Sequence, residues 1–195
     1  MTDKLSELRE EVLACTRCRL SGTRKNVVFG NGNPDAEIFV IGEAPGFDED
    51  RIGKVFVGKS GQLLDKIFEA CNFSRDKQLY ISNILKCRPP DNRNPGTDEQ
   101  KACIPYLLKQ IDIVDPKIII LLGSVPLKVF FGPDSKITRD RGAWKNYFSR
   151  WVMPTYHPSA LLRNPNLKTD SWKDFKNIIH KYRELVDPEH YCKYL

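Results

Sequence analysis

The stretch KIIILL at residues 117–122 is the strongest strand signal in the chain. Three other short apolar runs, at residues 37–41, 79–84 and 151–156, share its character. Continuous runs of this kind, rich in β-branched residues, are expected where both faces of a parallel sheet are covered by helices. These four runs therefore predict the strands of a buried sheet.

Helical patterns separate the four predicted strands. They occupy residues 61–71, 97–113, 125–131 and 172–185, and the second opens with Thr97, followed by Gln100 at the spacing of a capping box. Alternation of strands and helices is typical of a parallel sheet with helices on both faces. We therefore expect an α/β fold, a three-layer α/β/α sandwich.

Length, charge and hydropathy narrow the class of protein. The 195 residues fit a single domain spanning 1–195, and the net charge of +6 comes from 31 basic and 25 acidic residues. This excess suits a polyanionic partner, although a solvated surface explains it equally well. Residues 1–13 lack the apolar core of a secretion signal, and no stretch approaches the roughly 20 apolar residues of a membrane helix. We expect a cytoplasmic protein with reduced thiols and no membrane contact.

Four of the six cysteines have spacings that suggest metal ligation. Cys15 and Cys18 form a C-x2-C pair, whereas fifteen residues separate Cys87 from Cys103. Four thiolates suit tetrahedral zinc or an iron–sulfur cluster. The wide second pair favours a [4Fe–4S] cluster, because each corner of a cubane takes its own thiolate, but zinc, disulfides or unrelated buried thiols stay open. The fifth cysteine, Cys71, ends a helical run and is expected in the core.

Polar motifs follow each predicted strand. GEAPG at 42–46 follows the first strand, Asn83 lies at the end of the second, Gly123 follows the third, and HPS at 157–159 follows the fourth. Ligands of open α/β sheets bind outside the carboxyl ends of the strands. The sequence thus predicts one crevice that contains an asparagine, a histidine and a glycine-bounded turn.

Together these motifs resemble the family-4 uracil-DNA glycosylases, the iron–sulfur branch of that superfamily. The resemblance implies a four-stranded parallel sheet, a [4Fe–4S] cluster, and hydrolysis of the N-glycosidic bond of deoxyuridine in DNA, which leaves an abasic site for base excision repair. The motifs that carry it, in order, are Cys15 and Cys18, GEAPG at 42–46, FVGKSGQLL at 56–64, SNILKCRPP at 82–90, Cys103 and HPSALLR at 157–163. Its implied cluster ligands are Cys15, Cys18, Cys87 and Cys103.

The resemblance also assigns roles in the crevice. His157 matches the catalytic histidine that donates a hydrogen bond to uracil O2. Asn83 matches the asparagine that reads uracil, because its amide pairs with O4 and N3–H whereas cytosine presents the opposite pattern. Phe56 matches the aromatic residue on which the flipped base stacks.

The first motif departs from some relatives. Ala44 stands where some of them carry an aspartate, so we expect Glu43 to orient the water. Gly46 stands where other relatives carry a tyrosine that excludes the methyl group of thymine. Glu49 is the candidate residue for excluding thymine in its place. Backbone amides near Gly42, Glu43 and Gly46 are expected to bind the base, since glycine lets the main chain approach closely.

Further residues are expected to contact DNA. Ser60 and Ser159 are candidates for holding phosphates, and Lys59 and Arg163 for adding positive charge. Leu161 matches the apolar wedge that fills the gap left by the flipped nucleotide. The expected partner is uracil-containing DNA, single- or double-stranded, bound by a monomer. A replication-clamp contact cannot be read from the sequence.

Two other functions stay open at this stage. A glycosylase of the same fold with broader specificity would also remove other deaminated bases such as hypoxanthine or xanthine. A non-catalytic nucleic-acid-binding module would hold zinc on the four cysteines. Iron with visible absorbance separates the expected enzyme from a colourless zinc module.

Overall fold

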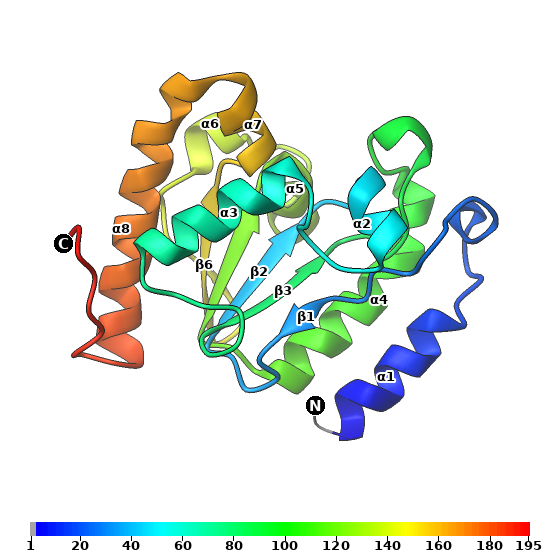
Figure 1. Ribbon diagram of the computed structural model, residues 1–195, viewed down its shortest axis with the longest axis horizontal. Coiled ribbons are helices and arrows are strands. Elements are labelled where there is room, and N and C mark those ends of the chain that lie inside the picture. Colours follow the sequence, from blue (N-terminus) through cyan, green and yellow to red (C-terminus); the bar gives the residue numbers. More distant parts are fainter. Residues whose placement is uncertain (1–2) are drawn as a thin grey trace.

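The computed structural model describes residues 3–195, which form a mixed sheet between two layers of helices (Figure 1). Four parallel strands, in the order β3-β2-β4-β6, make the centre of this sheet, as predicted. Two short antiparallel strands flank them, so the sheet has six strands rather than the expected four. The bounds are β1 Asn31–Gly32, β2 Ile38–Gly42, β3 Leu79–Asn83, β4 Ile118–Leu122, β5 Lys145–Tyr147 and β6 Arg150–Thr155.

The two edge strands escaped prediction because they lack the signal that revealed the others. β1 has two residues and β5 three, and neither contains a buried apolar run. All five residues of β4, by contrast, are buried. Strand prediction from apolar runs therefore succeeds where both faces of the sheet are covered.

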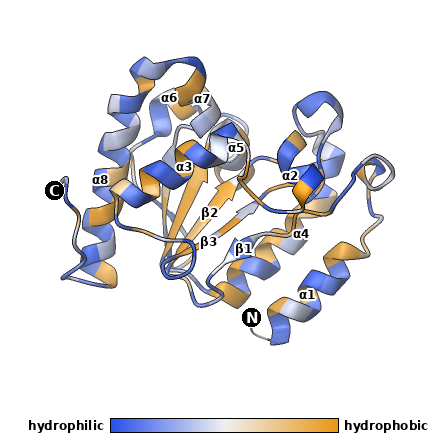
Figure 2. Ribbon diagram, viewed as in Figure 1, coloured by the Kyte–Doolittle hydropathy of each residue, from blue (hydrophilic) through white to orange (hydrophobic). Residues whose placement is uncertain are grey.

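Alternate residues of each central strand enter different hydrophobic cores. Ile118 and Ile120 pack on one face with α3 (Lys59–Ala70) and α8 (Lys168–Leu185). Ile119 and Leu121 pack on the other face, which α1 (Asp3–Leu13), α4 (Thr97–Val114) and α5 (Ser124–Phe131) cover. Figure 2 shows the apolar strands between helices that carry both polar and apolar residues. The three-layer sandwich is therefore confirmed.

Helices α3, α4, α5 and α8 agree with the four predicted ones except at their ends. α4 has Gly96 as its N-cap, and Glu99 rather than Gln100 returns to the cap backbone, so the predicted box was wrong by one residue. Three short helices, α2 Phe47–Ile52, α6 Ile137–Asp140 and α7 Pro158–Arg163, were not predicted. No helix within residues 3–195 has the length and apolar character needed to cross a bilayer.

The strand order places a crevice at one end of the sheet. The chain leaves β2 for α3 on one face, and it leaves β3 for α4 on the opposite face. Connections that diverge to opposite faces open a gap beyond the carboxyl ends of neighbouring strands. The predicted motifs lie at this end.

Candidate active site and cysteine cavity

A cleft lies where the carboxyl ends of the central strands meet. It encloses about 1530 Å³ of space between its walls, part of which is open to solvent. Residues after β2, β3, β4 and β6 all line it, as predicted from the strand ends. Those with an expected role are Glu43, Gly46, Glu49, Phe56, Ser60, Asn83, His157, Ser159 and Arg163.

Asn83 lies at the base of this cleft as the last residue of β3. Its side chain is 1% exposed, and its Oδ1 atom has no hydrogen-bond partner within the described part of the chain. Gly42 is its neighbour in β2, and a methyl group there would lie 2.3 Å from Oδ1. A buried acceptor without a partner is costly, so this atom is placed to receive a donor from a bound molecule.

Phe56 forms a second wall in an unusual backbone conformation. Its φ angle is +52°, a left-handed value that costs free energy in a bulky residue. Arg75 holds this conformation, because its guanidinium donates to the carbonyls of Val55 and Phe56 at 2.9 Å each. The Phe56 ring lies 5.7 Å from the His157 ring, centroid to centroid. The aromatic face thus meets the histidine across the cleft.

His157 is the N-cap of α7, and its hydrogen bonds define its tautomer. Its Nδ1 atom accepts from the backbone N–H of Ser159 at 3.1 Å and lies 2.9 Å from Ser159 Oγ. A nitrogen that accepts from a backbone amide carries no proton, so the proton of the neutral ring is on Nε2. Burial, aided by the positive charge of Arg163, lowers the His157 pKa to about 4. At neutral pH the ring is therefore an uncharged Nε2–H donor.

Glu43 and Glu49 line the cleft but differ in what their carboxylates contact. Burial raises the pKa of Glu43. Both oxygens of Glu49 instead accept from backbone amides: Oε1 from Val57 at 2.9 Å and Gly58 at 2.8 Å, and Oε2 from Gly46 at 3.2 Å. Glu49 thereby ties the turn after β2 to the segment before α3.

The residues expected to contact DNA are accessible to solvent, with one exception. Lys59 and Arg163 are exposed, and Ser60 and Ser159 are half-buried. Leu161, however, is 1% exposed, whereas Leu162 is 46% exposed. A wedge must reach DNA, so the burial of Leu161 contradicts its predicted role. The turn of α7 directs Leu161 inward and leaves Leu162 at the surface.

All four predicted ligand cysteines line a second cavity. It encloses about 360 Å³, part of which is open to solvent. N–H groups point at their sulfurs: Lys86 N lies 3.3 Å from Cys103, Arg24 Nη1 3.4 Å from Cys87, and Arg17 N 3.5 Å from Cys15. Burial raises the pKa of Cys87 to about 11, opposed by Arg24. The other two cysteines, Cys71 and Cys192, are buried elsewhere.

The four thiols line the same cavity. No three His, Cys, Asp or Glu side chains of residues 3–195 form a group that could hold a single metal ion.

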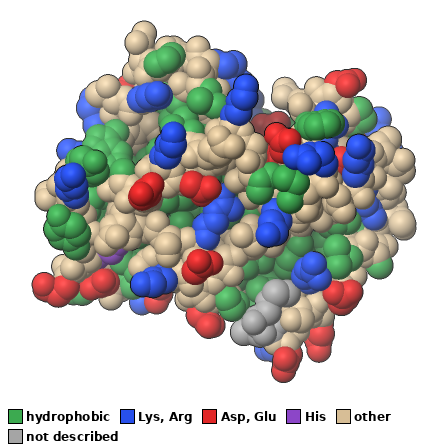
Figure 3. Space-filling view, viewed as in Figure 1, with side chains coloured by type: hydrophobic (Ala, Val, Ile, Leu, Met, Phe, Trp, Pro, Cys, Tyr) green, Lys and Arg blue, Asp and Glu red, His purple; other side chains and the backbone are tan. Residues whose placement is uncertain are grey.

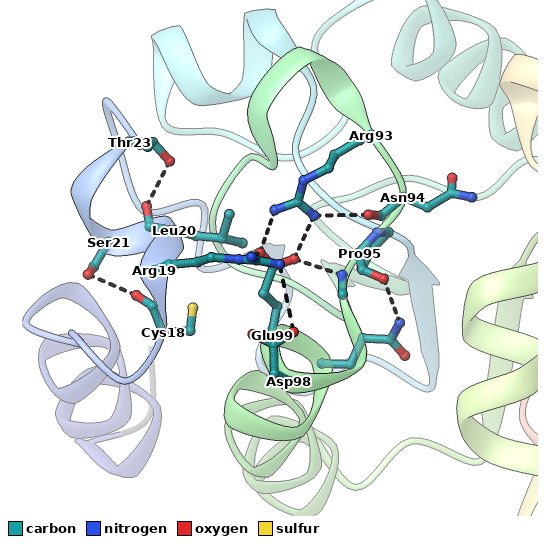
Figure 4. A network of polar contacts seen from close by, with 12 residues as sticks. Cys18, Arg19, Leu20, Ser21, Thr23, Arg93, Asn94, Pro95, Asp98 and Glu99 are labelled. Carbon is teal, nitrogen blue, oxygen red and sulfur yellow. Dashed lines mark hydrogen bonds and ion pairs between the residues drawn. The ribbon is translucent and has the colours of Figure 1, made fainter.

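An ionic network around the buried Glu99 links this cavity to the cleft, and no sequence pattern predicted it (Figure 4). Glu99 is fully buried and accepts from Arg19 at 2.8 Å, from Arg93 at 2.5 and 2.9 Å, and from Gly96 N at 2.7 Å. Arg93 and the other donors lower the Glu99 pKa to about 2. Arg19 follows Cys18, and Arg93 lines the cleft. The network thus joins the segments that carry both sites.

Comparisons with known proteins agree with this geometry. The model of the uracil DNA glycosylase superfamily matches residues 29–178. A type-4 uracil-DNA glycosylase of Sulfurisphaera tokodaii is 46% identical, over 97% of this chain and 88% of its own length. The enzymes of the same name from Saccharolobus solfataricus and Thermotoga maritima are 42% and 45% identical, over 90% and 80% of this chain and 85% and 81% of their own lengths. The chain therefore belongs to the uracil-DNA glycosylase superfamily, and within it to the type-4 family.

Proposed function

We propose that this protein is a uracil-DNA glycosylase of base excision repair, which hydrolyses the N-glycosidic bond of deoxyuridine in DNA. The observation that carries the proposal is the buried, unpartnered Oδ1 of Asn83 at the base of the cleft. Uracil offers a donor at N3–H and an acceptor at O4, and the Asn83 amide offers the complementary pair. Cytosine presents the opposite pattern and leaves both amide groups unsatisfied.

The same cleft supplies the other contacts that a flipped uracil needs. Extrusion from the stack brings the base into a pocket where an aromatic side chain can cover its face, and Phe56 provides that face. Gly42 leaves room for both Phe56 and Asn83, because a methyl group there would lie 2.7 Å from Phe56 Cζ. Substrate recognition therefore depends on three neighbouring residues with fixed geometry.

Chemistry at the glycosidic bond requires stabilisation of negative charge on uracil. The bond between C1′ and N1 breaks and both electrons leave with the base. A water oxygen bonds to C1′ and keeps one hydrogen as the new hydroxyl, while its other proton passes to the departing uracil anion. His157 Nε2–H donates to uracil O2 as charge develops there, as in an oxyanion hole. A neutral ring can serve, since its proton is on Nε2, the nitrogen that Ser159 leaves free.

Glu43 is the candidate for orienting the water. Its side chain lines the cleft and no aspartate follows it, since the next residue is Ala44. A carboxylate here also stabilises the positive charge that develops on the sugar. Glu49 acts on specificity by holding Gly46 close to Gly58, which keeps the turn against the base site.

The four cysteines fit a [4Fe–4S] cluster as the resident group. Their shared cavity and the N–H donors at their sulfurs fit four thiolates, each of which would bind one iron corner. When bound, the cluster joins Cys15 and Cys18 to the segments of Cys87 and Cys103 and takes no part in hydrolysis, which needs no redox step.

DNA is the proposed partner, bound by a monomer whose cleft is complete within one chain. Basic and apolar side chains lie together on the face where α2 begins (Figure 3). Phe47 is 53% exposed, with Arg88 5.3 Å and Lys25 6.0 Å from the ring centroid. Such a surface suits phosphates and unstacked bases. Leu162, rather than Leu161, is the wedge candidate.

Excision of uracil from a labelled oligonucleotide tests the function directly. The purified protein is incubated with strands containing uracil, cytosine, thymine or hypoxanthine, and alkali then reveals abasic sites. Alkali-sensitive breaks at uracil alone are expected. Comparable cleavage at hypoxanthine would instead support the broader deaminated-base specificity, and no cleavage of any strand would reject the proposal. Metal analysis of the same sample distinguishes iron from zinc.

A further inference from the structure

A largely buried ion pair lies beside the end of β6, and the function described so far does not account for it. Arg141, directly after α6, and Asp174, in the second turn of α8, form this pair, with side chains 16% and 1% exposed. The guanidinium donates from Nε, at 2.9 Å, and from Nη2 to the two oxygens of the carboxylate. It also donates to the backbone oxygen of Asp170. Arg141 is therefore fixed against α8 by several bonds of defined direction.

Asp174 holds the last residue of β6. Its Oδ2 atom accepts from the hydroxyl of Thr155 at 2.7 Å, and Thr155 is fully buried. Thr155 precedes His157 by two residues. The Thr155 carbonyl in turn accepts from the N–H of Gly123 at 2.9 Å. The residue is thus held by its side chain from α8 and by its backbone from the turn after β4.

Arg141 contacts the next residue, Tyr156. The guanidinium carbon lies 5.4 Å from the centroid of the Tyr156 ring, which is the range of a cation–π contact. Tyr156 is 9% exposed and lines the cleft. The two members of the ion pair therefore hold two successive residues that lead directly into His157.

Close packing restricts this end of β6 further. Gly142 has a φ angle of +74°, and a methyl group there would lie 2.5 Å from Asp174 Oδ1. Its N–H donates to the carbonyl of Pro154 at 3.0 Å. A methyl group on Gly123 would lie 3.1 Å from His157 Cβ. The segment that carries His157 is consequently in close contact with its neighbours at both ends.

Stability alone gives little reason for such a pair. Removing a guanidinium and a carboxylate from water costs free energy that their attraction does not always offset, and apolar residues of similar volume often replace a buried pair without loss. A fork-shaped guanidinium on a carboxylate does, however, fix the direction of both groups. Here the groups so fixed contact the residues in front of His157.

We infer that the Asp174–Arg141 pair positions His157 for hydrolysis, because it fixes Thr155 and Tyr156 immediately before it. Asp174 and Arg141 are positioning residues, since neither of them lines the cleft. The inference rests on the proposed function. It makes uracil excision depend on a contact that α8 supplies from outside the cleft.

Thr155→Val tests the contact with a small change. Valine has the shape of threonine but cannot donate to Asp174, whereas Thr155→Ser keeps the hydroxyl. Ile179→Val is the control for stability, because it removes one buried methylene group from the same helix. Three quantities are measured: single-turnover cleavage of a uracil-containing oligonucleotide, binding to its abasic product, and the NMR shifts of the His157 ring. The shifts report on position because the Phe56 ring lies 5.7 Å away.

Thr155→Val should slow cleavage at least about tenfold, because a small displacement of a catalytic group is costly. Product binding should stay nearly unchanged, and the His157 signals should move. Thr155→Ser and Ile179→Val should keep the rate and the signals of the wild type. In a His157→Ala background, Thr155→Val should cause no further loss, since its effect passes through His157.

Other outcomes would overturn the inference. An unchanged rate in Thr155→Val would reject it, as would a slower rate with unmoved His157 signals. An equal loss in Ile179→Val would assign the effect to stability, and a further loss in the His157→Ala background would show that the pair acts elsewhere in the cleft. If Thr155→Val does not fold, Arg141→Lys, which keeps the charge without the fork, takes its place with the same expected results. Wild-type protein that excises no uracil would reject the proposed function and leave the His157 signals as the test of positioning.

Discussion

The cleft and the cysteine cavity are built in different ways. The cleft is formed by the ends of strands whose backbones pair in register, such as Gly42 with Asn83. The cysteine cavity is lined from three separate segments: Cys15 and Cys18 follow α1, Cys87 follows β3, and Cys103 lies in the second turn of α4. The sheet holds the first site without any bound group, while the second depends on side chains from distant segments. Substitutions in the cleft should therefore impair activity, and substitutions in the cavity should impair folding.

The largest effect is expected from Cys87→Ala. An incomplete set of four thiolates leaves the segments around the cavity unconnected, so iron, visible absorbance and most of the soluble yield should be lost. Cys71→Ala is the control, because Cys71 lies in the other hydrophobic core. Iron content is measured on both purified proteins. Full iron in Cys87→Ala would exclude it as a ligand, and loss of iron in Cys71→Ala would contradict the assignment of the four ligands.

Asn83→Asp tests the cleft without touching the cavity. The substitution replaces the amide donor by an acceptor, so uracil loses its O4 hydrogen bond. Uracil excision should fall by about 10² or more, comparable to the loss of one positioned donor, while iron content stays at the wild-type level. The rate is measured on a uracil-containing oligonucleotide. An unchanged rate would remove Asn83 from base reading, and reduced iron would show that the two sites are not separable.

His157→Ala should act on the chemical step. The Nε2–H bond strengthens as charge develops on uracil, so single-turnover cleavage should slow by about 10² while binding to uracil-containing DNA stays nearly intact. Fluorescence anisotropy gives the binding and quenched-flow sampling gives the rate. Equal losses in both would identify His157 as a residue that shapes the cleft.

Leu162→Ala should have a smaller effect that depends on the substrate. Flipping from a duplex costs a few kcal/mol of unpairing and unstacking, which a single strand largely avoids. Excision from a G·U duplex should therefore slow about tenfold, with little change on single strands. Leu161→Ala, at the buried neighbour, should instead lower the melting temperature. A duplex-specific loss in Leu161→Ala would restore the role predicted for it from sequence.

The smallest effect is a spectroscopic one. Because the His157 pKa is lowered to about 4, its ring should be neutral, with the proton on Nε2, at pH 6, where an ordinary histidine is mostly protonated. Long-range ¹H–¹⁵N spectra of labelled protein detect the tautomer. The unfolded chain takes up this proton below about pH 6.5, so His157 should cost stability as the pH falls from there toward 4. A protonated ring at pH 6 would contradict the neutral donor.

Two kinds of feature could be predicted from the sequence: strands that appear as local apolar runs, and residues whose place follows from the order of strands and helices. The four central strands were predicted from apolar runs. Because ligands of such sheets bind outside the carboxyl ends of the strands, Asn83 and His157 were correctly predicted to share one cleft. Leu161 shows where this reasoning stops. Successive residues on a helix differ by about 100° in direction, so a motif match cannot decide which of two adjacent leucines reaches the surface.

Contacts between distant side chains were beyond prediction. The sequence predicted Gln100 as the capping-box partner, whereas Glu99 fills that place and also accepts from Arg19, 80 positions away. Nothing in the motif SNILKCRPP indicated that Lys86 is buried, although its side chain donates to Gln110 of α4. Nothing in the local pattern distinguishes such residues from solvated charges, because their role depends on which helices pack together.

The position of the four cysteines also constrains the order in which the molecule matures. Cys15 and Cys103 lie about 88 positions apart, and the chain between them includes β2, α3 and β3. Closing a loop of this length in an unfolded chain costs conformational entropy, so we expect the ligands to meet after the intervening strands and helices have packed. Iron and sulfide would then enter a largely folded chain. Because the segments around the cavity stay unconnected until the cluster enters, we expect the iron-free form to be short-lived, and the supply of clusters to set how much of the repair enzyme accumulates.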